Sequence, residues 1–215
     1  MINTVLFDMD GVLIDSEPVI IKAATKALSE VGITATREFF EPFLGAGEEF
    51  FIIGPCKDAG IPEKTDATMA AMYQYYNDAV YRELTVHPHA AETIQALHAA
   101  GITVALVSSS AREKLLISLD AAKIPAECFS LILSGSDVTR KKPDPEPYQK
   151  AAEKLGKDPK DCLVIEDALN GIQAAKAAGM FCAAVTTSFP KASLLDAGAD
   201  MILSGLDEIL SIVTL

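Results

Sequence analysis

Beyond residue 85 the chain alternates between short apolar runs and amphipathic segments. The apolar runs, typical of buried strands, are 102–109, 129–134, 161–167, 180–187 and 200–205. A segment with helical spacing follows each run, at 110–122, 145–156, 168–179, 191–198 and 206–213. Strands that alternate with helices in this way predict right-handed βαβ units and a mostly parallel, doubly wound α/β sheet.

The first part of the chain follows the same pattern and then leaves it. Residues 2–8 form an apolar run that we expect to be a central strand of the sheet, because no polar face interrupts it. Residues 17–32 and 65–84 have helical character, and the stretch between them contains no convincing strand.

This break predicts a second, small domain. We expect a helical cap domain at residues 16–85, inserted after the first strand of a Rossmann-like core that is made of residues 1–15 and 86–215. Residues 14–18 and 85–92 would be the two linkers.

Composition and charge narrow the class of partner. The chain has 18 Lys and Arg against 30 Asp and Glu, a formal net charge of -12, which argues against a general nucleic-acid or anionic-membrane binder. The start of the chain lacks the basic region of a signal peptide, and no apolar run is long enough to span a membrane. The four cysteines form no C-x-x-C pair and three lie in or beside apolar runs, so we expect reduced, buried thiols in a cytoplasmic protein. We also expect a monomer.

Polar side chains gather where the predicted strands end. In doubly wound sheets ligands bind beyond the carboxyl ends of the strands, so these residues should share one site. The residues concerned are Asp8, Asp10, Ser108, Ser109, Lys141, Lys142, Glu166 and Asp167.

Each of these groups has a simpler interpretation. The two aspartates at the first strand suit a turn, and Ser110 suits the N-cap of the next helix. The basic loop suits a solvated surface, and the acids at 166 and 167 suit a helix start. Four unrelated explanations at one sheet edge are less economical than one site. Clustered carboxylates suit Mg²⁺, and a carboxylate can attack phosphorus with a lysine and a hydroxyl nearby to bind the transferring group.

Four motifs in this order resemble the haloacid dehalogenase superfamily of phosphohydrolases. They are FDMDGVLIDSE (7–17), VSSS (107–110), KKPDP (141–145) and IEDALNG (165–171). The resemblance covers essentially the whole chain, and within the superfamily it is nearest to β-phosphoglucomutases and small phosphosugar phosphatases with a helical cap.

The resemblance implies a role for each catalytic and substrate-binding residue. Asp8 would be the nucleophile, and Asp10 the acid that protonates the leaving oxygen and then the base that activates water. Ser108, the backbone N–H of Ser109 and Lys142 would bind the phosphoryl oxygens.

The same resemblance implies a Mg²⁺ site. Its ligands would be Asp8, the backbone carbonyl of Asp10, and Asp167, with Glu166 as a ligand or a neighbour of the ligands. Residues 16–85 would match the cap that closes over the site and excludes water. Asp15 and Glu17 fall at the entrance to the first cap helix, where acids favour a helix N-terminus, so we expect a structural role for both.

Three functions are compatible with these residues. A Mg²⁺-dependent phosphatase acting on a small phosphorylated metabolite, such as a sugar or polyol phosphate, is favoured. A phosphoglucomutase-like phosphotransferase is disfavoured, because mutases of this branch carry histidine where Ile20 stands and arginine where Glu48 stands. Glu48 instead becomes a candidate substrate contact. A non-catalytic binding protein is the third, and it is disfavoured because every expected chemical group is present.

Overall fold

The sheet predicted from the alternating pattern is present. In the computed structural model, which describes residues 2–40, 43 and 47–213, six parallel strands lie in the order β5-β4-β1-β6-β7-β8. Their bounds are β1 Thr4–Phe7, β4 Thr103–Val107, β5 Leu131–Leu133, β6 Cys162–Glu166, β7 Phe181–Val185 and β8 Met201–Leu203. The doubly wound α/β fold class is therefore confirmed, with β1 at its centre.

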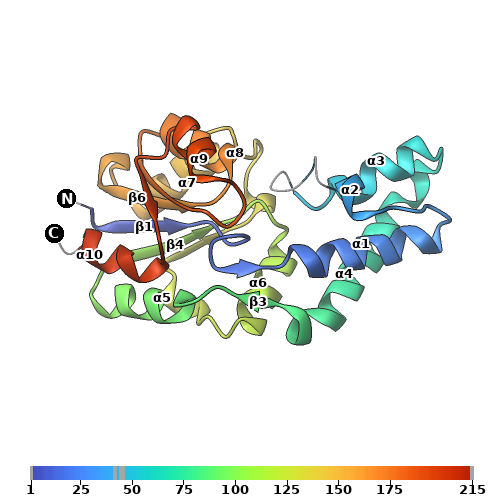
Figure 1. Cartoon of the computed structure of the whole chain (residues 1–215), viewed down its shortest axis with the longest axis horizontal. Coiled ribbons are helices and arrows are strands. Elements are labelled where there is room, and N and C mark those ends of the chain that lie inside the picture. The colour runs from blue at the N-terminus through green and yellow to red at the C-terminus, as the bar shows by residue number, and fades with distance from the viewer. Residues whose placement is uncertain (1, 41–42, 44–46, 214–215) are drawn as a thin grey trace.

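Helices cover both faces of this sheet (Figure 1). One layer contains α5 Ala90–Ala99, α6 Arg112–Ala121 and α10 Ile209–Val213. The other contains α7 Glu146–Leu155, α8 Leu169–Ala177 and α9 Lys191–Asp196. Alternate residues of β1 enter the two layers, since Val5 and Phe7 join one hydrophobic cluster and Leu6 joins the other. A strand buried on both faces explains why its sequence is apolar throughout.

A helical unit lies beside one end of the sheet (Figure 1). It contains α1 Glu17–Glu30, α2 Arg37–Phe40, α3 Phe50–Asp58 and α4 Thr65–Glu83. These helices pack around a hydrophobic cluster of their own, in which Phe40, Met72 and Tyr76 are fully buried. Among the described residues between α1 and α4 there is no strand. We propose that this unit is the cap domain expected from the sequence.

The two connections between the sheet and the helical unit form a feature that the sequence did not predict. Strand β2, Ile14–Asp15, pairs antiparallel with β3, Thr85–Val86. The chain leaves the core through β2 and returns to it through β3. Because these two strands are paired, both connections lie side by side. Segments of two residues are too short to leave a periodic pattern, which is why we expected only linkers here.

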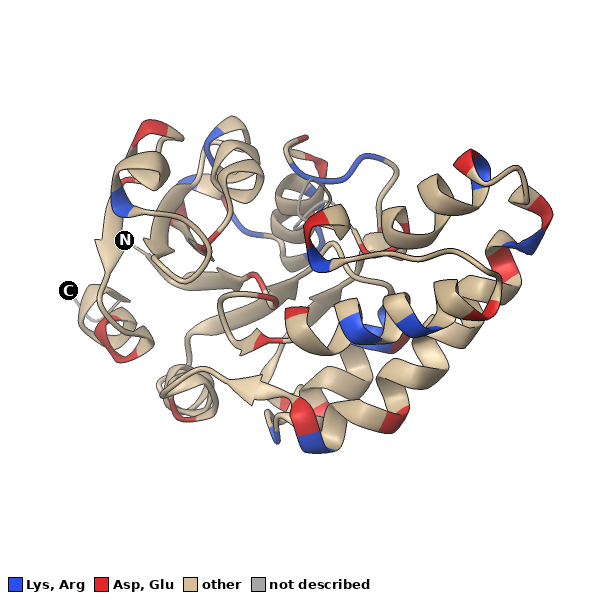
Figure 2. Ribbon diagram, turned by 45° about the vertical axis from the view of Figure 1, so that its right-hand side comes forward, with Lys and Arg blue, Asp and Glu red and all other residues tan. Residues whose placement is uncertain are grey.

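Three further properties of the described residues concern membrane spans, the distribution of charge and the cysteines. No helix among these residues combines the length and the apolar character that a membrane span requires. Figure 2 shows the Lys and Arg positions scattered over the core and the helical unit, interspersed with Asp and Glu. All four cysteines are buried and free, as expected.

Candidate active site

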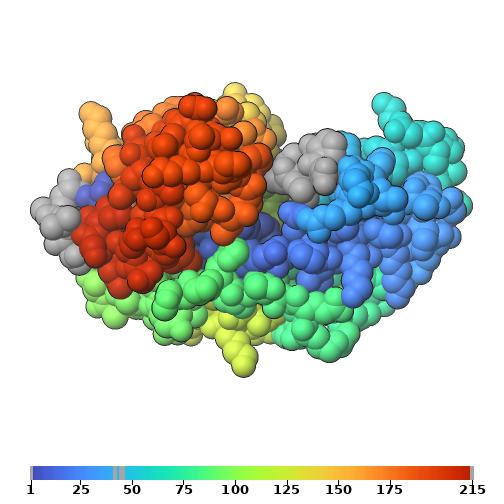
Figure 3. Space-filling model, viewed as in Figure 1, coloured from blue at the N-terminus to red at the C-terminus, as the bar shows by residue number. Residues whose placement is uncertain are grey.

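The strand register brings the candidate residues together. Phe7 of β1 is paired with Leu106 of β4 on one side and with Ile165 of β6 on the other. The residues that follow these three positions therefore meet at the carboxyl edge of the sheet. They line a cleft between this edge and the helical unit, and the opening is visible in Figure 3.

Lys142 is the positive charge nearest to Asp8. Its Nζ lies 2.5 Å from Asp8 Oδ1 and 2.7 Å from Glu166 Oε1, and it donates to the carbonyl of Val107 at 3.0 Å. The Lys142 side chain is buried, with only 4 % exposed, while 13 % of the Asp8 side chain remains exposed. The neighbouring Lys141 instead forms an ion pair with Glu49 of the helical unit. The structure thus places Lys142, rather than Lys141, next to Asp8, the predicted nucleophile.

Three carboxylates form a group that could hold a metal ion. Asp8, Glu166 and Asp167 each offer an oxygen within 4.8 Å of the others. Burial raises the pKa of Asp8 to about 7, with Lys142 opposing this shift and Glu166 adding to it. Burial and the charges of Glu166 and Asp8 also raise the pKa of Asp167 well above its usual range. An all-oxygen donor set with excess negative charge fits a hard divalent cation.

Glu166 is the most constrained member of this group. Its Oε1 accepts from Lys142 and from the Tyr148 hydroxyl, both at 2.7 Å, and its Oε2 accepts from the backbone N–H of Asp167 at 3.0 Å and of Ala168 at 3.2 Å. Tyr148 lies on α7 and is fully buried. Its role was not predicted, because a tyrosine in an amphipathic helix is ordinarily a core residue.

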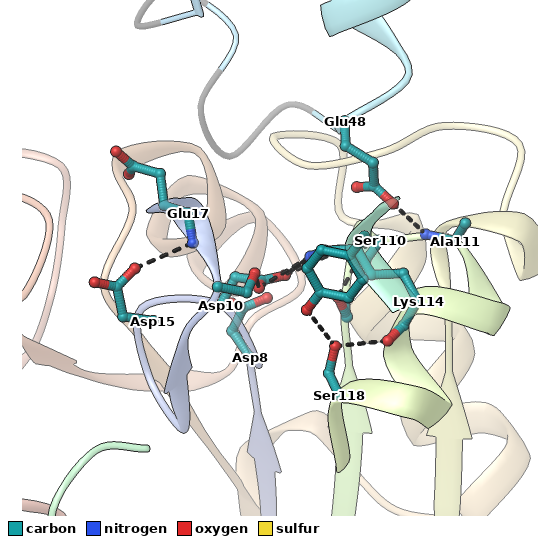
Figure 4. Close-up of polar contacts among 12 residues, drawn as sticks. Asp8, Asp10, Asp15, Glu17, Glu48, Ser110, Ala111, Lys114 and Ser118 are labelled. Carbon is teal, nitrogen blue, oxygen red and sulfur yellow. Dashed lines mark hydrogen bonds and ion pairs between the residues drawn. The ribbon is translucent and has the colours of Figure 1, made fainter. Parts of the chain in front are cut away.

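Asp10 is not part of the three-carboxylate group and has partners of its own. Its carboxylate accepts from the hydroxyls of Ser16 and Ser110 and from Lys114 (Figure 4). Burial opposes the shift, but these contacts hold the pKa of Asp10 below its usual value. Any contact of Asp10 with a metal ion would therefore involve its backbone carbonyl, as the family resemblance implies.

Ser110 is not the helix cap that its position suggested. Helix α6 has Ala111 at its N-cap, and Ser110 is buried with its hydroxyl bound to Asp10 and Lys114. The prediction of an N-cap was wrong because the Ser110 hydroxyl contacts the charged groups of Asp10 and Lys114 instead of capping α6.

Lys114 was not predicted as a site residue from the sequence. It is buried on α6, and Asp10 and Glu48 raise its pKa above the usual range although burial opposes this. A signal was available, since Lys114 belongs to the buried stripe of α6 together with Leu115, Ser118 and Leu119. A lysine within an apolar helical stripe indicates a buried charge that has a partner.

The two serines at the end of β4 line the cleft near Asp8. Ser108 is buried, and its Oγ accepts from the backbone N–H of Ser110 at 3.1 Å. Ser109 follows it, and its carbonyl leaves no room for a side chain on Gly135. Both serines line the same cleft as Lys142, so these three residues share one site, as the sequence predicted.

Glu48 reaches the cleft from the helical unit. Its Oε1 accepts from the backbone N–H of Ala111 at 3.0 Å (Figure 4) and from the Tyr73 hydroxyl at 3.2 Å. The carboxylate therefore lies at the positive N-terminal end of α6, a position that favours an anion. Glu48 is buried and lines the cleft, so the structure brings it to the site although it is 40 residues from Asp8 in sequence.

The remaining acids of the first motif have structural contacts. Asp15 Oδ1 accepts from the backbone N–H of Glu17 at 3.1 Å, at the start of α1 (Figure 4). Gly11, with φ of +85°, turns the chain after Asp10, and a Cβ at this position would overlap with the Asp167 carboxylate.

This fold and this site define a phosphohydrolase of the α/β class. The chain belongs to the haloacid dehalogenase-like hydrolase family, whose profile matches residues 5–185. It is 34 % identical over 202 residues to a phosphoglycolate phosphatase of Salmonella paratyphi A, covering 83 % of this chain and 79 % of that protein.

Two further proteins show how widely this chain's relatives differ. It is 37 % identical over 204 residues to Protein SUPPRESSOR OF QUENCHING 1, chloroplastic, of Arabidopsis thaliana, covering 94 % of this chain but only 19 % of that longer protein. The solved structure of CbbY from Rhodobacter sphaeroides in complex with phosphate superposes with a TM-score of 0.86 and 27 % identity, covering 100 % of both chains.

Proposed function

We propose that the protein is a Mg²⁺-dependent phosphatase that hydrolyses a small phosphorylated metabolite through an aspartyl phosphate on Asp8. One observation carries the proposal. Asp8 lies at the cleft beside Lys142, Glu166 and Asp167, while Asp10, two residues later, accepts from a separate set of donors. Two carboxylates with different environments suit two different roles.

In the first half of the reaction, Asp8 attacks phosphorus and the bond to the leaving oxygen breaks. Lys114 and two hydroxyls favour the ionised form of Asp10, so Asp10 must take up a proton before it can act as an acid. It then donates this proton to the leaving oxygen, and the leaving group departs as an alcohol. Lys142, the Ser108 hydroxyl and the backbone N–H of Ser109 bind the phosphoryl oxygens, where charge is spread in the transition state.

In the second half, Asp10 takes a proton from water as the water oxygen attacks phosphorus. The bond between phosphorus and Asp8 breaks, and inorganic phosphate and the free carboxylate result. The helical unit, acting as a cap, limits the access of other water to the cleft.

The acidic residues would hold the metal ion. Asp8, Asp167 and the backbone carbonyl of Asp10 are the proposed ligands, and Glu166 either joins them or orients Lys142 and its neighbours. When bound, Mg²⁺ supplies positive charge that offsets both the carboxylates and the incoming phosphate.

Glu48 supports a preference within the substrate class. A buried carboxylate at the N-terminus of α6 occupies the place where a second anionic group of a substrate would be favoured. We propose that Glu48 selects phosphomonoesters whose other end carries hydroxyls. The same residue, with Ile20 also lining the cleft, disfavours a mutase, which must bind a second phosphate. We further propose a cytoplasmic monomer that acts on one small molecule without nucleic acid or membrane.

A phosphoester panel with purified protein and Mg²⁺ tests this function. We expect release of inorganic phosphate from one or more small monoesters by the wild type and none by Asp8→Asn. Equal release by both would refute the role of Asp8, and no release by either would favour a binding protein. Isomerisation of β-glucose 1-phosphate in the presence of a bisphosphate primer would instead favour the mutase.

A further inference from the structure

Lys114 is a second buried lysine at the cleft, and the proposed chemistry does not use it. Only 3 % of its side chain is exposed. Removing an ammonium group from water is unfavourable by several kcal/mol unless a close partner compensates it. With so little exposure, Lys114 has little surface with which to touch a substrate. Its partners must therefore explain its position.

The partner of Lys114 is Asp10. Its Nζ lies 3.0 Å from Asp10 Oδ1 and 2.9 Å from Oδ2, so both oxygens of the carboxylate are held. The same Nζ donates to Ser110 Oγ at 2.9 Å, and this hydroxyl donates to Asp10 Oδ2. Ser16, which precedes α1, donates to Oδ1. A carboxylate held by three side chains from two segments of the chain has one orientation, while 34 % of its side chain remains exposed.

Lys114 itself is fixed by the interface between the sheet core and the helical unit. Its Nζ lies 5.6 Å from the centre of the Tyr76 ring on α4, within the range of a cation–π contact. Its carbonyl accepts from Ser118 Oγ at 2.6 Å, and that hydroxyl lies 2.7 Å from the Tyr76 hydroxyl (Figure 4). The ammonium group is therefore supported from both α6 and α4.

We propose that Lys114 is a positioning residue that holds the Asp10 carboxylate in the orientation from which it exchanges a proton with the leaving oxygen. This inference rests on the proposed function, because it presumes that Asp10 is the general acid. Lys114 contributes no atom to the reaction. Its positive charge favours the ionised form of Asp10, while its two hydrogen bonds fix the orientation of the carboxylate. The orientation matters because a general acid contributes roughly 10²–10⁴-fold only when it is correctly placed.

The leaving group provides the test. Lys114→Met keeps an unbranched side chain that is one atom shorter, and it removes the charge. The value of kcat/KM reports the first irreversible step, in which the leaving oxygen needs a proton if it is an alkoxide but scarcely needs one if it is a nitrophenolate. We expect kcat/KM to fall about 10- to 100-fold on an alkyl monoester, and less than about threefold on p-nitrophenyl phosphate. Lys154→Met, an exposed lysine on α7, is the matched control and should change neither value.

A second comparison guards against a folding defect. Asp10→Asn with Lys114→Met removes both charges of the pair, so no unpaired charge stays buried. If Lys114 acts through Asp10, the double variant hydrolyses p-nitrophenyl phosphate as fast as Asp10→Asn alone. A further loss in the double variant, or equal losses on both esters in Lys114→Met, would overturn the inference. A wild type without phosphatase activity would instead refute the proposed function, which separates the two failures.

Discussion

Gly171 offers a quantitative test of how tightly the site is built. It lies in α8, directly behind the Glu166 carboxylate, and a Cβ at this position would come well inside the 3.0 Å that Cβ atoms essentially never cross. Gly171→Ala should therefore displace a carboxylate that accepts four hydrogen bonds. Hydrogen bonds to a charged group contribute about 1.5–3 kcal/mol each.

The expected loss of stability follows from these terms. Alanine gains about 0.5–1 kcal/mol in a helix over glycine. Displacing Glu166 weakens at least its contacts with Lys142 and Tyr148, which outweighs this gain. We expect Gly171→Ala to lower the free energy of unfolding by about 2–4 kcal/mol. For a chain of this size the melting temperature should fall by roughly 4–16 °C.

Gly54 provides the matched control. It also lies in a helix, α3, without a positive φ, and a Cβ there meets nothing within 4 Å outside its two chain neighbours. Gly54→Ala should therefore change the free energy of unfolding by less than about 1 kcal/mol, because the helix propensity of alanine stabilises α3 while the following Pro55 disfavours a Cβ before it. Urea denaturation followed by circular dichroism measures both variants. If Gly171→Ala is as stable as the wild type and keeps full phosphatase activity, the view that Glu166 is locked in place is wrong.

Three further changes probe the rest of the site. Tyr148→Phe removes one donor to Glu166, so urea denaturation should show a loss of about 1–3 kcal/mol; a loss below about 0.5 kcal/mol would contradict the hydrogen bond. Mg²⁺ at 100 times its dissociation constant should stabilise the wild type by about 2.7 kcal/mol, measured by urea denaturation with and without the ion. Asp167→Asn should lose most of this stabilisation, and equal stabilisation of both proteins would exclude Asp167 as a ligand. Glu48→Gln keeps the shape of the side chain and removes its charge, so kcat/KM for phosphoglycolate relative to a polyol phosphate should rise about five- to tenfold, equivalent to ~1 kcal/mol. An unchanged ratio would exclude Glu48 from substrate selection.

The sequence itself specified the fold class and the reacting edge. Apolar runs of strand length that alternate with amphipathic helices have few packing solutions, and the register of a parallel sheet brings the ends of its strands together. Asp8 and Asp167 were found for this reason, because each directly follows a strand. Lys142 was assigned from the motif KKPDP, through the family resemblance.

Only the tertiary structure decided how the charges are paired. Lys142 contacts Asp8, Lys114 contacts Asp10, and Glu48 reaches α6 from the helical unit. These contacts join residues 63 to 134 positions apart, and each depends on how a helix or loop packs against the sheet. A buried charge is stable only beside its partner, and the partner is chosen by the whole fold.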